Sequence, residues 1–124
     1  MSARSEDFSR KALGSSHAGL GEWLLQRLTA LYISGFIVYA TLRFSIAPID
    51  NYAEWTIWFA SGAVRVSWAL FVASILVHAW IGLRSVYLDY LHPLWLRVAA
   101  LILTGTALWA LAFWSAQLLF GRSA

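Results

Sequence analysis

Residues 66–83 have the sequence VSWALFVASILVHAWIGL, a run of eighteen residues without a formal charge between Arg65 and Arg84. A helix rises about 1.5 Å per residue, and about 20 apolar residues span the hydrocarbon core of a bilayer. With a short extension at either end, this run is long enough to cross. It therefore predicts a membrane-spanning helix, and this helix contains one ionisable side chain, His78.

The composition of the whole chain extends this prediction to the rest of the protein. Of the 124 residues, 60% are hydrophobic and 12% are charged, whereas soluble domains are about 25% charged. Eight Trp, five Tyr and seven Phe suit the membrane–water interface. The lack of cysteine excludes disulfides, Fe–S ligation and thiol catalysis by this chain. The net charge of +3 comes from scattered basic residues without a basic stripe, which indicates topology and not nucleic-acid binding.

The apolar runs predict an all-α integral membrane fold with three transmembrane helices. We expect the crossings at about 23–47, 65–90 and 94–120. Residues 22–124 would form this three-helix membrane unit, and residues 1–21 a polar cytoplasmic N-terminal tail. Near the N-terminus there is no short apolar run of the kind found in secretory signals, so we expect the tail to be retained.

The residues outside the crossings indicate how the chain lies in the bilayer. The linker at 49–63 places several aromatic residues around a single Glu54, which predicts a short amphipathic segment on the membrane surface. Basic residues favour the cytoplasmic side of a membrane. A cytoplasmic N-terminus places six basic residues on that side and three on the far side. The six are Arg4, Arg10, Lys11, Arg27, Arg84 and Arg97, and the three are Arg43, Arg65 and Arg122.

His78 is the most informative residue of the second crossing. It lies six residues before Arg84, about 9 Å along a helix, and therefore inside the apolar layer. An ionisable side chain at this depth is costly and indicates a function or a specific partner. Ser74 and Gly82 lie one turn to either side, and their small size leaves room for a second helix or a flat macrocycle such as haem. The alternative is a neutral histidine that hydrogen-bonds a neighbouring helix.

The number of available ligands turns the haem hypothesis into a prediction of a partner. A low-spin electron-transfer haem usually has two axial ligands, and the apolar spans of this chain contain only His78. His17 and His92 lie outside these spans, and the single methionine is Met1. A haem bound to His78 would therefore take its second ligand from another protein chain.

Asp89 and Tyr90 form a second candidate site at the end of the second crossing. Eleven residues separate His78 from Asp89, almost three helical turns, so both lie on one face about 16 Å apart along the axis. A carboxylate and a phenol suit a quinone, whose carbonyls accept hydrogen bonds and whose reduction consumes two protons. The alternative is an ordinary interfacial tyrosine beside a helix-end aspartate. Arg27, on the same side, would pair with a haem propionate or Asp89, or snorkel to lipid phosphate.

Three stretches of the chain resemble a known family. They are YAEWTIWFAS at 52–61, SILVHAWIGL at 74–83 and DYLHPL at 89–94. They look like the smaller of the two hydrophobic membrane anchors of bacterial succinate dehydrogenase (respiratory complex II). The resemblance covers all three crossings, from about Trp23 to Phe120, and is weak in the N-terminal tail.

The resemblance implies a role in electron transfer in the bacterial inner membrane. The chain would be half of a heteromeric helical bundle with a companion anchor subunit, and the bundle would dock the iron–sulfur and flavoprotein subunits on the cytoplasmic face. His78 would be one axial ligand of the iron of haem b, with a histidine of the companion anchor as the other. Tyr90 would hydrogen-bond the ubiquinone headgroup, with Asp89 beside it, and Arg27 would lie near the haem and the quinone.

Several functions stay open on the sequence. The leading interpretation is a succinate:quinone oxidoreductase anchor that supplies half of a haem site and part of a quinone pocket, without a complete active site of its own. A fumarate reductase anchor would run the reaction towards succinate. A non-redox membrane scaffold would bind no haem. A transporter fits less well, because one buried ionisable residue and no broken helix provide little for a substrate path.

Overall fold

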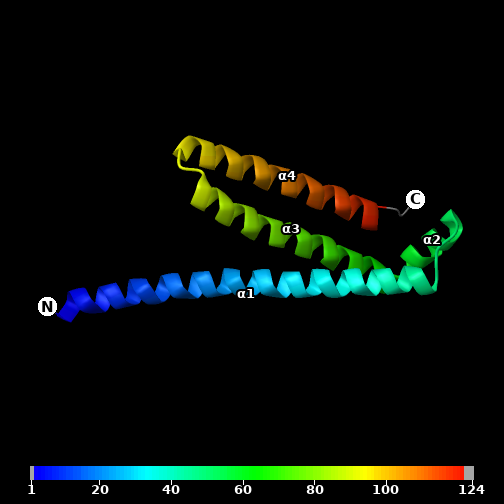
Figure 1. The fold of residues 1–124 in the computed structure, drawn as a ribbon, viewed down its shortest axis with the longest axis horizontal. Helices are drawn as coiled ribbons and strands as arrows, with labels where there is room; N and C mark the ends of the chain where they lie inside the picture. Colours follow the sequence, from blue (N-terminus) through cyan, green and yellow to red (C-terminus); the bar gives the residue numbers. More distant parts are fainter. Residues whose placement is uncertain (1, 122–124) are drawn as a thin grey trace.

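The computed structural model describes the backbone of residues 2–121 and the side chains of residues 19–121. Its described part consists of helices and short connections, without strands (Figure 1). The all-α fold predicted from the composition is therefore confirmed. The helices are α1 (Ser2–Ile46), α2 (Tyr52–Ala60), α3 (Gly62–Tyr90) and α4 (Leu94–Phe120).

Three helices contain segments that are long and apolar enough to cross a membrane. These segments are Gly19–Ile46, Gly62–Tyr90 and Leu94–Phe120. They lie close to the three predicted crossings, and α3 ends where the second crossing was expected to end. The backbone of α1 is helical on both sides of residue 21, so the predicted boundary between tail and membrane unit is a change in composition and not a break in the helix.

Local sequence signals explain where the helices begin and end. Helices α1 and α3 end shortly before Pro48 and Pro93. A proline disfavours the helical conformation of the residue before it, which explains both ends. At the start of α2, Asn51 Oδ1 accepts a hydrogen bond from the backbone N–H of Glu54 at 2.9 Å. Asn51 Nδ2 in turn donates to Glu54 Oε1 at 2.8 Å. The first of these bonds satisfies a backbone N–H at the start of α2 that has no partner within the helix, and the second holds the two side chains together.

Helix α3 is the central element of the fold (Figure 1). It runs antiparallel to α1 on one side and to α4 on the other, and α1 and α4 do not contact each other in the described part of the chain. The helices thus form an open layer without a closed core. Among residues 19–121 only Thr29, Phe36 and Ile81 are buried. The many exposed apolar side chains require lipid or further helices to cover them.

Aromatic side chains join α1, α2 and α3 at the end of α3 that follows α2. The Phe36 ring stacks on Phe71 with centroids 4.5 Å apart, and the edge of Trp68 meets it at 5.0 Å. The hydroxyl of Tyr32 donates to the backbone carbonyl of Ser67 at 3.0 Å. These contacts fix how α1 is placed along α3, and so determine which residues of the two helices face each other near His78.

Contacts between α3 and α4 include one polar pair. Tyr87 Oη and Thr104 Oγ1 lie 2.9 Å apart. The ring of Trp80 packs over Gly105, where a Cβ would lie 3.5 Å from the indole, an ordinary contact distance. Small residues at such crossings allow helices to pack closely in membranes.

We expect Tyr87→Phe to weaken the α3–α4 contact without changing its shape. The variant removes one interhelical hydrogen bond, which in membrane proteins contributes about 0.6 kcal/mol. Thr104→Val removes the same hydrogen bond from the side of α4. The double variant should therefore lose no more stability than either single variant. Titration of the detergent-solubilised protein with SDS measures these losses. Additive losses would contradict a direct bond between the two hydroxyls.

Candidate functional site

His78 lies half-buried on the face of α3 that packs against α1. Its Nδ1 atom lies 3.2 Å from Thr29 Oγ1 and 3.3 Å from the backbone carbonyl oxygen of Gln26. Both partners belong to α1, about fifty residues earlier in the chain. The histidine was evident from the sequence, whereas both partners were missed. Thr29, a polar residue inside an otherwise apolar segment, was a signal for an interhelical contact, whereas the Gln26 contact uses a backbone carbonyl, which no residue type reveals.

The second ring nitrogen of His78 has a different environment. Nε2 has no hydrogen-bond partner among residues 19–121, since both polar contacts of the ring are at Nδ1. A haem iron or another metal is bound by a neutral imidazole nitrogen with a free lone pair. The residues around His78 therefore fit an axial ligand that acts through Nε2. Among the described residues, no group of three or more His, Asp or Glu side chains that could hold a metal ion comes together.

The small residues beside His78 have a more specific role than their size alone indicates. A Cβ added to Gly82 would lie 3.8 Å from Nε2 of the Gln26 side chain. The glycine therefore faces α1, and the Gln26 side chain lies beside it at an ordinary contact distance.

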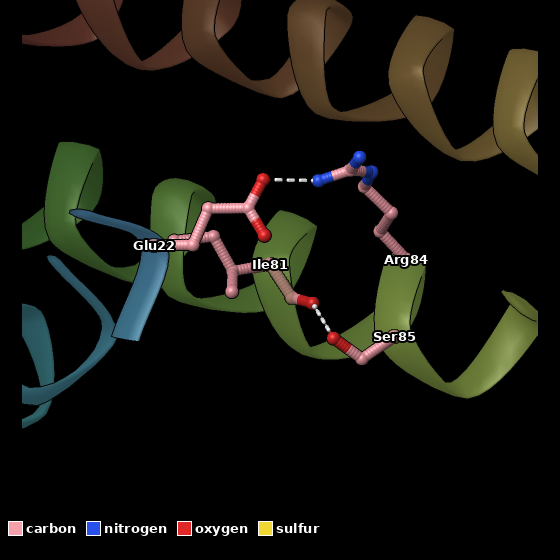
Figure 2. Close-up of polar contacts among 4 residues, drawn as sticks. All are labelled: Glu22, Ile81, Arg84 and Ser85. Atoms are coloured by element: carbon pink, nitrogen blue, oxygen red, sulfur yellow. Dashed lines mark hydrogen bonds and ion pairs between the residues drawn. The ribbon is translucent and has the colours of Figure 1, made fainter. Parts of the chain in front are cut away.

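An ion pair joins α1 and α3 one to two turns beyond His78 (Figure 2). Arg84 Nη1 donates to Glu22 Oε1, and their side chains are 41% and 50% exposed. Ser85 follows Arg84 on α3, and its Oγ donates to the backbone carbonyl of buried Ile81 at 3.0 Å. From the sequence, Arg84 was assigned to the end of the apolar run and to the cytoplasmic side, and Glu22 was not identified. Antiparallel neighbours bring the start of one span beside the end of the next, which places Glu22 and Arg84 in the same region but does not select them as a pair.

Arg27 points away from this interface. It is exposed, and its guanidinium carbon lies 5.5 Å from the centroid of the Trp23 ring on the same helix. Among residues 19–121 it forms no ion pair, with Asp89 or with any other carboxylate. Its charge is therefore available to an anion from outside the chain.

Asp89 and Tyr90 lie in the last turn of α3, which is continuous from His78 to this point. Both are exposed, and Tyr90 is 75% exposed. The following connection is held by Arg97, whose Nε and Nη2 both donate to the carbonyl of Leu91, at 3.1 and 3.0 Å. The phenol and the carboxylate thus project from a braced helix end, but this chain alone does not enclose them.

A groove lies at the opposite end of α3. Its volume is about 770 Å³, and its walls come from α2, α3 and α4. Arg65 is the one charged residue of its lining, which also contains uncharged polar, aromatic and aliphatic side chains. None of the four candidate residues from the sequence takes part in this groove. Its lining includes Trp55, Phe59, Arg65, Trp68, Val72 and Leu118.

Comparison with known proteins finds a family to which most of the chain is similar. Residues 4–114 match the family described as succinate dehydrogenase/fumarate reductase transmembrane subunit. The matched range includes both candidate sites and most of α4. One curated relative is the succinate dehydrogenase hydrophobic membrane anchor subunit of Coxiella burnetii. It is 29% identical over 109 residues, which cover 83% of this chain and 95% of the relative.

Proposed function

Because the chain belongs to the family of succinate dehydrogenase/fumarate reductase transmembrane subunits, we propose that it anchors a succinate:quinone oxidoreductase in the bacterial inner membrane. The observation that carries the proposal is His78, a histidine in an apolar helix whose Nδ1 is bound within the chain and whose Nε2 is not. The chain would hold half of a haem site and part of a quinone site, and the catalytic oxidation of succinate would occur on partner subunits.

At the first site, His78 would supply one axial ligand to haem b through Nε2. Haem in this position supplies one-electron transfer. The second axial ligand would come from a companion anchor subunit, because His92 lies in the connection after α3 and His17 precedes the first span. The open layer of helices supports such a partner, since the exposed apolar faces of α1, α3 and α4 leave room for more helices. Arg27, which lacks a carboxylate partner among the described residues, would neutralise a haem propionate.

At the second site, Tyr90 and Asp89 would bind the quinone headgroup. The Tyr90 hydroxyl would donate a hydrogen bond to a quinone carbonyl, and this bond would strengthen as the oxygen gains negative charge. The Asp89 carboxylate would pass protons to the reduced quinone or hold the tyrosine in place. Their exposure supports a pocket that other subunits complete. With a cytoplasmic N-terminus, this end of α3 would face the iron–sulfur and flavoprotein subunits.

Purification of the tagged chain from membranes tests the proposal as a whole. We expect a b-type haem, a flavoprotein and an iron–sulfur protein to purify with it, together with succinate:quinone reductase activity. Deletion of the chain should move succinate oxidation with a water-soluble dye from the membrane to the soluble fraction. A chain that purifies without haem and flavin, while its deletion leaves this activity on the membrane, would be a non-redox scaffold.

A further inference from the structure

We propose that Thr29, together with the backbone carbonyl of Gln26, is a positioning residue for His78. In this proposal α1 holds the proton of the imidazole on Nδ1, directs Nε2 away from α1, and sets how strongly this nitrogen donates electrons to a bound metal. The inference rests on the proposed function, because its consequence is measured on the haem that His78 would bind.

The hydrogen-bond partners determine which ring nitrogen carries the proton. Thr29 Oγ1 lies 2.8 Å from the carbonyl of Leu25 and 3.0 Å from that of Gln26. Carbonyls only accept, so the hydroxyl proton points back to the preceding turn of α1. The hydroxyl oxygen then accepts from His78 Nδ1, and the Gln26 carbonyl, 3.3 Å from the same atom, also accepts. Both contacts require the proton on Nδ1, which leaves the lone pair on Nε2.

The surroundings of Thr29 hold this arrangement in place. Thr29 is only 8% exposed, so water does not compete for the contact, and its hydroxyl is already anchored to its own helix. Further contacts join α1 and α3 on both sides of Thr29. The Glu22–Arg84 ion pair lies on one side (Figure 2), and the stacked rings of Phe36 and Phe71 lie on the other. The imidazole is therefore oriented by this chain alone, before any companion anchor binds.

The chemical consequence follows from the direction of the hydrogen bond. An imidazole that donates from Nδ1 to an oxygen acceptor is more basic at its other nitrogen. A stronger donor at Nε2 stabilises the ferric state of a haem more than the ferrous state. Loss of the Thr29 hydroxyl should therefore raise the haem midpoint potential and weaken haem retention. Loss of such a supporting hydrogen bond typically lowers metal affinity about tenfold or more.

The test compares Thr29→Val with Thr41→Val in the intact purified complex. Thr41 is a matched control, because it lies on α1, its hydroxyl donates to the carbonyl four residues earlier at 2.8 Å, and it is exposed. An optical redox titration gives the haem midpoint potential, and the haem-to-chain ratio gives retention. We expect a raised potential and lower retention for Thr29→Val, wild-type values for Thr41→Val, and recovery in Thr29→Ser, which keeps the hydroxyl.

Thr29→Ala is measured in parallel, because it removes the hydroxyl without adding a methyl group and should shift the potential in the same direction. A haem potential in both variants equal to that of Thr41→Val would overturn the proposal. So would failure of both to assemble, since Thr29 would then act through packing. The ligand itself is tested separately: a haem that is unaltered in His78→Ala would refute the haem assignment of the proposed function, whatever Thr29 does.

Discussion

The purified complex carrying His78→Ala is expected to lose its low-spin haem b signal. His78 is the one histidine inside an apolar span, and its free Nε2 is the atom that would bind the iron. Without it the haem keeps at most one axial ligand, so it either leaves the site or becomes high-spin. A reduced-minus-oxidised spectrum, together with the haem-to-chain ratio, measures both outcomes.

His92→Ala is the matched control for this variant. It removes the same side chain from the exposed connection between α3 and α4, outside the described spans. We expect its haem spectrum to equal that of the wild type. If the low-spin signal persisted in His78→Ala, the histidine would serve only to join α3 to α1, as the alternative drawn from the sequence describes.

The second large effect is expected for Tyr90→Phe, which keeps the ring and removes the hydroxyl. A donor that stabilises developing charge on a quinone oxygen is worth about 1.5–3 kcal/mol, so succinate:quinone reductase activity should fall about tenfold to 150-fold. Succinate oxidation with a water-soluble dye should not change, because the dye takes its electrons before the quinone. Steady-state rates with both acceptors separate the quinone step from the rest.

Tyr87→Phe provides the control for Tyr90→Phe within the same helix turn. Its hydroxyl is already bound to Thr104, so it points to α4 and not to a ligand. Its removal should lower stability slightly and leave quinone reduction close to wild type. If the Tyr90 and Tyr87 variants had the same activity with quinone, Tyr90 would be an interfacial tyrosine without a role at the headgroup.

The three helices that are long and apolar enough to cross a membrane lie close to the segments expected from the sequence. The reason is that the positions and the ends of these helices depend on local properties: apolar runs require about 20 residues to span a bilayer, and prolines after α1 and α3 end the helices nearby. The placement of His78 and Asp89 on one continuous helix followed in the same way, because helical spacing repeats about every 3.6 residues. The identity of the candidate residues came from residue type and depth, together with the family resemblance.

Contacts between helices came only from the tertiary structure. Thr29 and Gln26 face His78, and Glu22 pairs with Arg84, because packing of aromatic and small side chains sets how α1 is shifted and rotated against α3. Spacing along one helix contains no information on that shift. For the same reason the sequence could not choose among the possible partners of Arg27. In the structure Arg27 is exposed on α1 beside the Trp23 ring. Periodicity within a helix is local and can be counted in the sequence, but the register between helices is decided by packing across the whole interface.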